Sequence, residues 1–132
     1  MKKKILIVMA DYYETISKGL LNNTKEKLQE PFDLISVPGV FEIPVTIAKN
    51  IKKYDGFIAL GSVIKGETPH FDLISKAAID GIMKLSIEYK KPIGNGIITC
   101  LNLKQAIARE KKGQEAAAAL LSVLYPDKVS AK

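Results

Sequence analysis

The chain has 132 residues, of which 47% are hydrophobic and 26% are charged. This length and composition fit one globular domain, residues 1–132, and they exclude a disordered or fibrous protein. No apolar run approaches the length of a membrane span, and the run 5–10 is too short for the core of a signal peptide. The one cysteine, Cys100, excludes an internal disulfide and favours a small buried thiol. We therefore expect a cytoplasmic protein without membrane contact.

The net charge of +6 raises the question of a nucleic-acid partner. The lysines are scattered in short clusters, however, and the aromatic residues, 7% of the chain, are not interleaved with them. We interpret the charge as a solvated surface that attracts anions, and we expect no nucleic acid as a partner. Arg109 is the only arginine among the 20 basic residues. A planar guanidinium suits a phosphate, although chance retention on a helix is the alternative.

Strand-like and helix-like segments alternate along the chain. Residues 4–10 form a nearly continuous apolar run, which is typical of a strand buried on both faces. The other predicted elements are a helix over 15–30, a strand over 32–37, a helix over 43–53, a strand over 56–60, a helix from Pro69 to about Tyr89, a strand over 93–100, a helix over 103–111 and, after a break at Gly113, a helix over 114–125. This alternation predicts an α/β fold with three α/β/α layers, a four-stranded parallel sheet and flavodoxin-like topology.

Residues 60–72 carry the densest chemical signal in the chain. The segment follows the third predicted strand and contains Gly61 and Gly66, which let a backbone turn sharply and approach a ligand closely. The dipeptide Thr68–Pro69 is typical of a helix start, with threonine as the cap and proline at the first helical position. The only histidine, His70, then falls in the first helical turn, whose unpaired N–H groups suit a phosphate or an oxyanion. A helix start with a merely structural histidine is the alternative, and these residues alone leave it open.

In a parallel sheet, the segments that follow the strands lie at one edge, and ligands bind there. In this chain those segments are 11–13, 37–42, 61–70 and 99–109. They bring together an aromatic residue, a carboxylate, the only histidine and the only arginine. This convergence favours functional roles for His70 and Arg109.

Three motifs resemble the lumazine synthase family of riboflavin biosynthesis. They are PGVFEIP at 38–44, GSVIKGETPHFD at 61–72, and GIIT at 96–99 followed by QAIAR at 105–109. The resemblance covers nearly the whole chain, and the motifs have the family's order and spacing. The resemblance implies a transferase that condenses 5-amino-6-(D-ribitylamino)uracil with 3,4-dihydroxy-2-butanone 4-phosphate to 6,7-dimethyl-8-ribityllumazine. Phosphate and water are released, and the resemblance implies neither a metal nor an organic cofactor.

The resemblance also implies roles for individual residues. His70 would move protons, Tyr12 would stack on the pyrimidine ring, and Glu42 would accept hydrogen bonds from the ribityl hydroxyls. The implied pyrimidine and ribityl contacts are Tyr12, Val40, Phe41, Glu42, Val63, Ile64 and Asn95. The implied phosphate contacts are Glu67, Thr68 and Arg109, with Lys112 as the nearest candidate for a lysine that the family often carries there.

Two positions depart from the family's pattern. Asn95 stands where many members carry an aromatic residue that covers the ring, and the segment 110–113 is shorter than the usual loop. The first predicted strand also follows the N-terminus almost directly, without the extension that many members use between subunits.

The resemblance implies a homopentamer with active sites at the subunit interfaces. Tyr12, Glu42, Thr68 and His70 would come from one subunit, and Asn95 and Arg109 from the next. The helix after Pro69 has a face of small residues (Ala77, Ala78 and Gly81), which suits close packing against another subunit or against the chain's own sheet.

A phosphoacceptor module of the same topology is the competing interpretation, because 7–11 is similar to the start of a receiver domain. Such a domain needs an acidic cluster after the first strand and an aspartate at the end of the third. Here Asp55 precedes the third predicted strand and Gly61 follows it, which disfavours that function. A nucleic-acid-binding protein is a weaker alternative, which salt-dependent binding would test.

Overall fold

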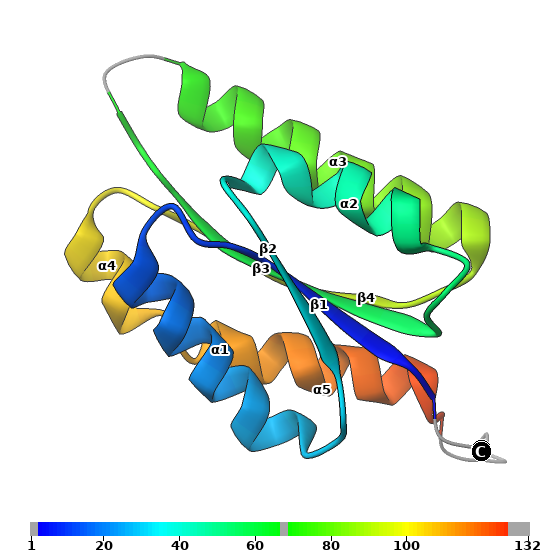
Figure 1. The fold of residues 1–132 in the computed structure, drawn as a ribbon. Helices are drawn as coiled ribbons and strands as arrows, with labels where there is room; N and C mark the ends of the chain where they lie inside the picture. Colours follow the sequence, from blue (N-terminus) through cyan, green and yellow to red (C-terminus); the bar gives the residue numbers. More distant parts are fainter. Residues whose placement is uncertain (1–2, 67–68, 127–132) are drawn as a thin grey trace, which may run out of the picture.

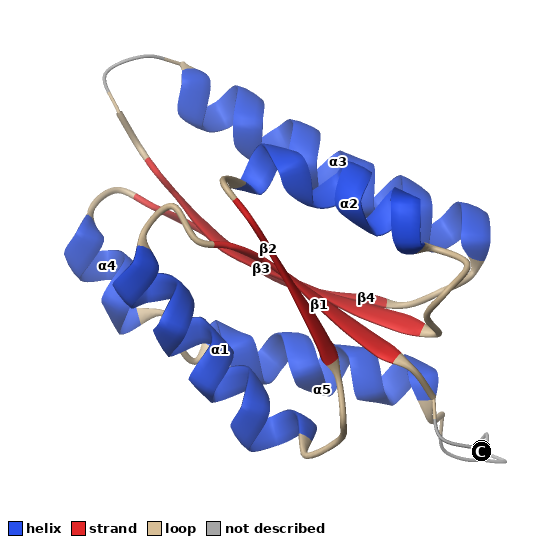
Figure 2. Cartoon of the chain, viewed as in Figure 1, coloured by secondary structure: helices blue, strands red, loops and turns tan. Residues whose placement is uncertain are grey.

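The computed structural model describes residues 3–66 and 69–126, and it shows a parallel sheet with helices on both faces (Figure 1, Figure 2). The strands lie in the order β2-β1-β3-β4 and are β1 (Ile5–Ala10), β2 (Asp33–Val37), β3 (Gly56–Ile64) and β4 (Ile93–Cys100). The helices are α1 (Glu14–Leu28), α2 (Ile43–Asn50), α3 (His70–Tyr89), α4 (Leu103–Ala108) and α5 (Lys112–Leu124), with a short 3-10 helix, η1 (Val40–Glu42), before α2. The predicted three-layer fold is confirmed. None of these helices combines the length and apolarity that a membrane span requires.

β1 is the centre of the core, because all six of its residues are buried. Successive side chains of a strand point to opposite faces of the sheet. The odd-numbered side chains, from Ile5 to Met9, therefore pack with α1 and α5. The even-numbered side chains, from Leu6 to Ala10, pack with η1, α2 and α3. The continuous apolar run in the sequence is thus explained by two cores, one on each face.

β3 is longer than the sequence predicts. It runs past Leu60 to Ile64, and its last four residues pair in register with residues 97–100 of β4. The predicted sharp turn at Gly61 is therefore wrong, and neither Gly61 nor Gly66 has a positive φ. The missing side chain at Gly61 instead permits close packing. An added Cβ would lie 2.8 Å from Cγ2 of Val40 and 3.0 Å from Cβ of Ala10.

Several helix boundaries differ from the prediction, and α1 spans Glu14–Leu28 where the sequence predicts 15–30. Pro69 is the N-cap of α3 and not its first helical residue, so the helix begins at His70. The predicted cap, Thr68, lies outside the described residues. Arg109 is the C-cap of α4 and not a residue within it. α2 ends at Asn50 and is followed by a turn before β3.

The small-residue face of α3 packs largely within the chain. Ala78 is only 1% exposed and belongs to the core between the sheet and α2 and α3. A Cβ on Gly81 would lie 3.0 Å from Cβ of Pro44, so this glycine allows α3 to approach α2. Ala77 alone among the three is exposed.

The predicted helix break at Gly113 is also wrong. α5 begins at Lys112 and includes Gly113, which is buried. A Cβ at this position would overlap the carbonyl oxygen of Leu20 and would lie 2.7 Å from Oγ1 of Thr24. Gly113 therefore brings α5 against the backbone of α1, and it does not end a helix.

This contact predicts an unusual effect of Gly113→Ala. In an ordinary helix, glycine is less stable than alanine by about 1 kcal/mol. Here we expect Gly113→Ala to lower the free energy of unfolding by about 1–3 kcal/mol, because α1 and α5 must move apart. Gly19→Ala in α1 is the matched control, since the nearest atoms to its new Cβ belong to the flexible Glu110 side chain, which can rotate away. Urea unfolding measures both, and a Gly113→Ala protein as stable as the unsubstituted one would contradict this packing.

Candidate active site

A cleft of about 600 Å³ opens at the carboxyl end of the sheet. Its walls come from the loop after β1, from η1, from the end of β3 and from the first turns of α3. The lining residues are Tyr12, Tyr13, Gly39, Val40, Phe41, Glu42, Ser62, Val63, Ile64, His70 and Ile74. The cleft thus brings together the predicted site residues of these four segments that the structure describes.

The loop after β1 is short and is held at both ends. The N–H of Asp11 donates to the carbonyl of Val37 at 3.0 Å, which ties the loop to β2. The Ser17 hydroxyl donates to the carbonyl of Ala10 at 2.6 Å, which ties the start of α1 to the end of β1. Tyr12 projects from this fixed loop with 75% of its surface exposed.

η1 forms a second wall and is anchored by a buried side chain. Val40 is 4% exposed and packs against the space that Gly61 leaves on β3. The next two residues are therefore held at the cleft, Phe41 exposed and Glu42 half-buried. The Thr46 hydroxyl donates to the carbonyl of Glu42 at 2.8 Å and continues this support into α2.

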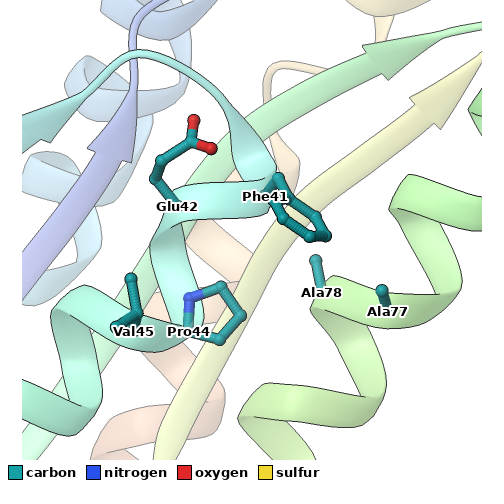
Figure 3. A pocket seen from close by; sticks show the side chains of 6 residues that line it. All are labelled: Phe41, Glu42, Pro44, Val45, Ala77 and Ala78. Carbon is teal, nitrogen blue, oxygen red and sulfur yellow. The ribbon is translucent and has the colours of Figure 1, made fainter.

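A groove of about 410 Å³ adjoins the cleft between η1, α2 and α3. Its lining residues are Phe41, Glu42, Pro44, Val45, Ala77 and Ala78. Figure 3 shows the Phe41 ring directed toward Ala77 and Ala78 of α3, with the Glu42 carboxylate directed away from them. The described lining of the groove is therefore mainly apolar apart from Glu42, whereas the cleft holds His70 as well as Glu42.

The end of β3 and the start of α3 complete the cleft. Ser62, Val63 and Ile64 are half-buried on β3, and His70 is exposed as the first residue of α3. Sequence reasoning does not assign Tyr13, Gly39, Ser62 and Ile74, although they line the same cleft. For Tyr13 and Ser62, the available signal was their position in the sequence next to Tyr12 and Val63, which the resemblance does assign. Because the predicted third strand ends at residue 60, the prediction does not show that strand residues 62–64 reach the site.

Asn95 does not line the cleft. It lies in β4 beside Ala59 of β3, well before the carboxyl end of its strand. Its side-chain oxygen accepts a hydrogen bond from the backbone N–H of Ile97 at 3.0 Å. β4 is an edge strand with β3 as its one neighbour in the described sheet, so this bond occupies a backbone donor of the sheet edge.

Arg109 and Lys112, the predicted phosphate contacts that the structure describes, likewise do not line the cleft. Glu67 and Thr68 lie outside the described residues. Arg109 follows α4, which contacts α1, and its Nη1 donates to the carbonyl of Thr99 at 2.9 Å. Lys112 begins α5 and pairs with Glu115 at 3.7 Å.

The start of α4 is fixed by a reciprocal pair of hydrogen bonds. The Asn102 side chain accepts from the N–H of Gln105 at 2.9 Å, and the Gln105 side chain accepts from the N–H of Leu101 at 2.8 Å. Such caps satisfy donors that a helix start leaves unpaired. They hold the short helix α4, which ends at the residue before Arg109, next to the end of β4.

The site combines an acceptor, a proton-transfer group and an exposed ring on mainly apolar walls. Glu42 can accept hydrogen bonds, and an imidazole such as that of His70 can donate or accept a proton. The described lining of the cleft includes neither lysine nor arginine. Within residues 3–66 and 69–126, no group of three or more His, Cys, Asp or Glu side chains could hold a metal ion.

The resolved pKa shifts belong to groups that do not line the cleft. A hydrogen bond from the Tyr54 hydroxyl to Asp33 raises the pKa of Tyr54, and a hydrogen bond from Tyr125 to Glu30 raises the pKa of Tyr125. The hydrogen bond from Lys18 lowers the pKa of Glu14. These shifts come from surface pairs and do not distinguish the site.

Comparison with known proteins covers almost the whole chain. The family described as 6,7-dimethyl-8-ribityllumazine synthase has a sequence model that matches residues 2–126. The enzyme of that name from Agrobacterium fabrum is 41% identical over 93% of this chain and 93% of its own length. The relative from Bartonella henselae is 44% identical over 86% of this chain and 78% of its own length. The relative from Limosilactobacillus reuteri is 42% identical over 92% of this chain and 85% of its own length.

Proposed function

The chain belongs to the 6,7-dimethyl-8-ribityllumazine synthase family, and on that basis we propose that it is the transferase of riboflavin biosynthesis that makes this lumazine. Its substrates are then 5-amino-6-(D-ribitylamino)uracil and 3,4-dihydroxy-2-butanone 4-phosphate. The observation that carries the proposal is the family match over residues 2–126, and the cleft that collects Tyr12, Glu42 and His70 supports it.

The cleft suits a flat ring with a polyhydroxyl chain. Its volume of about 600 Å³ is within the range of about 300–1,000 Å³ that is usual for small-molecule sites. Tyr12 offers an exposed ring on which a pyrimidine can stack. Glu42 offers carboxylate oxygens to ribityl hydroxyls, and a charged acceptor makes such hydrogen bonds stronger than a neutral one does. The strand residues Val63 and Ile64 lie beside them and would contact the heterocycle.

The proposed chemistry requires proton movement and close placement of two substrates. An amine of the pyrimidine adds to the ketone, and loss of water leaves an imine. Phosphate then leaves by elimination, and the enol that remains becomes a ketone. The second amine attacks this ketone and closes the ring with loss of a second water. His70 would move protons in these steps, which typically contributes about 10²–10⁴-fold. Holding both substrates together in the cleft supplies a further part of the acceleration.

The phosphate-binding side of the site is proposed to be completed by a second subunit. The described lining lacks a cationic side chain, whereas Arg109 is held at the end of β4 by the carbonyl of Thr99. We assign Arg109 and Asn95 to the site of a neighbouring subunit in a homopentamer, with Glu67 and Thr68 from the subunit that supplies His70.

Exposed apolar side chains support such an assembly. Large hydrophobic residues of η1, α2 and α3 are 58–68% exposed in the isolated chain: Phe41, Val45, Leu73, Met83 and Ile87. Groups of exposed apolar residues often mark protein interfaces. The contribution of Lys112, the cytoplasmic location and the absence of a nucleic-acid partner stay predictions.

The first functional prediction concerns product formation and His70. The purified protein should convert the two substrates to a lumazine, detected by its absorbance or fluorescence. His70→Ala should lower turnover by about ten- to a thousandfold, because proton transfer is lost while both substrates still bind. His70→Gln is a control that keeps hydrogen bonding without proton transfer, and circular dichroism checks the fold. An unaltered turnover number in both variants would remove His70 from the mechanism.

The second prediction separates the two substrates at Arg109. Arg109→Lys keeps the charge but loses the two-point fork of the guanidinium. We expect the Michaelis constant for the phosphate-bearing substrate to rise more than that for the pyrimidine. Lys104→Ala, in the short helix α4 that precedes Arg109, controls for general loss of surface charge. Equal increases for both substrates would show that Arg109 does not bind the phosphate selectively.

The third prediction tests the shared site. His70→Ala and Arg109→Ala proteins, each with little activity, are mixed under conditions that let subunits exchange. Some interfaces then pair an intact His70 with an intact Arg109, so activity should partly return. Light scattering and native mass spectrometry establish that mixed oligomers have formed. If they form and activity stays at the level of the single variants, both residues come from one subunit and the proposal is wrong.

A further inference from the structure

Tyr12 is the most exposed aromatic side chain that lines the cleft, and its ring contacts a second tyrosine. The ring centroids of Tyr12 and Tyr13 lie 4.8 Å apart, and the ring planes meet at 80°. This is an edge-to-face contact, the arrangement that aromatic rings prefer to a face-to-face sandwich. Such a contact uses the edge of one ring and one face of the other. At least one face of Tyr12 therefore stays open for a ligand.

Tyr13, in contrast, is held by the protein. It is half-buried and packs against the core between the sheet, α1 and α5. It is the N-cap residue of α1, and its carbonyl accepts a hydrogen bond from the N–H of Ser17 at 3.0 Å. The Ser17 hydroxyl in turn bonds to the end of β1. Tyr13 thus joins the fixed core to the exposed ring beside it.

We propose that Tyr13 is a positioning residue that holds the Tyr12 ring in the orientation that stacks on the pyrimidine substrate. This inference rests on the proposed function, and it assigns a role to a residue that the resemblance leaves unassigned. A tyrosine that is 75% exposed is free to change rotamer unless a neighbour restrains it. The edge-to-face contact restrains Tyr12 before the substrate arrives, so less side-chain freedom is lost on binding.

This role predicts a selective loss of pyrimidine affinity. Tyr13→Leu removes the ring but keeps an apolar side chain against the core. Its Michaelis constant for the pyrimidine should rise about three- to tenfold, as expected for the loss of one aromatic pair. Turnover at saturation and the Michaelis constant for the phosphate-bearing substrate should change less than twofold. Tyr13→Phe keeps the ring and should behave like the unsubstituted protein.

The test is a double-mutant cycle of Tyr13→Leu with Tyr12→Ala. The readouts are the Michaelis constants and the direct binding of the pyrimidine substrate alone by calorimetry. If Tyr13 acts through Tyr12, Tyr13→Leu should have no further effect once Tyr12 is alanine. The matched control is Tyr54→Leu, because Tyr54 makes an edge-to-face contact with Phe57 at 6.0 Å and 64° but does not line the cleft. It should lower stability without changing either Michaelis constant.

The outcomes separate this inference from the proposed function. An unsubstituted protein that makes no lumazine would overturn the function itself. An active protein in which the two substitutions add independently would overturn only the role of Tyr13. Tyr13→Phe as impaired as Tyr13→Leu would show that the hydroxyl matters and not the ring, which also contradicts the proposal. If Tyr54→Leu raises the Michaelis constant for the pyrimidine by the same factor, the effect comes from general destabilisation, and the role of Tyr13 is contradicted.

Discussion

Burial of β1 on both faces is the constraint on which the rest of the structure depends. All six of its residues, Ile5 to Ala10, lie inside, and each large apolar side chain removed from water contributes about 1.5–3 kcal/mol. Such a strand needs a neighbour on each side and a helical layer above and below. Parallel neighbours require helical crossovers. The loops that follow the strands then meet at one edge of the sheet, and the cleft lies there.

Small residues set how closely the layers approach. Gly61 lets Val40 pack on β3, which places the other two residues of η1, Phe41 and Glu42, at the cleft. Gly113 lets α5 reach the backbone of α1 in the opposite layer. Both glycines have ordinary backbone angles, since no described glycine has a positive φ. Their function in the fold is therefore close packing, and at Gly61 that packing also forms a wall of the site.

The candidate site residues fall into two separate places in the described chain: Tyr12, Glu42 and His70 line the cleft, and Arg109 lies outside it. Tyr12, Glu42 and His70 meet in one cleft because the loop after β1, η1 and the end of β3 lie beside one another at the carboxyl end of the sheet. Arg109 follows the edge strand β4 and is held by the carbonyl of Thr99, on the side where α4 meets α1. A phosphate-bearing substrate in the cleft would need a cation that the described lining does not provide. This separation is the physical reason for proposing an assembly in which an edge of one subunit faces the cleft of another.

The sequence by itself determined the number and order of the strands, the parallel sheet and the segments that reach its carboxyl edge, because the period of apolar residues records burial directly. It also identified His70 as the first-turn histidine of α3. Only the tertiary structure decided where β3 ends, that Gly113 lies inside a helix, and that the Tyr13 ring contacts the Tyr12 ring. A glycine in a turn and a glycine in a close contact look alike in a sequence. The difference lies in the atoms that a Cβ would meet, and those atoms come from distant parts of the chain.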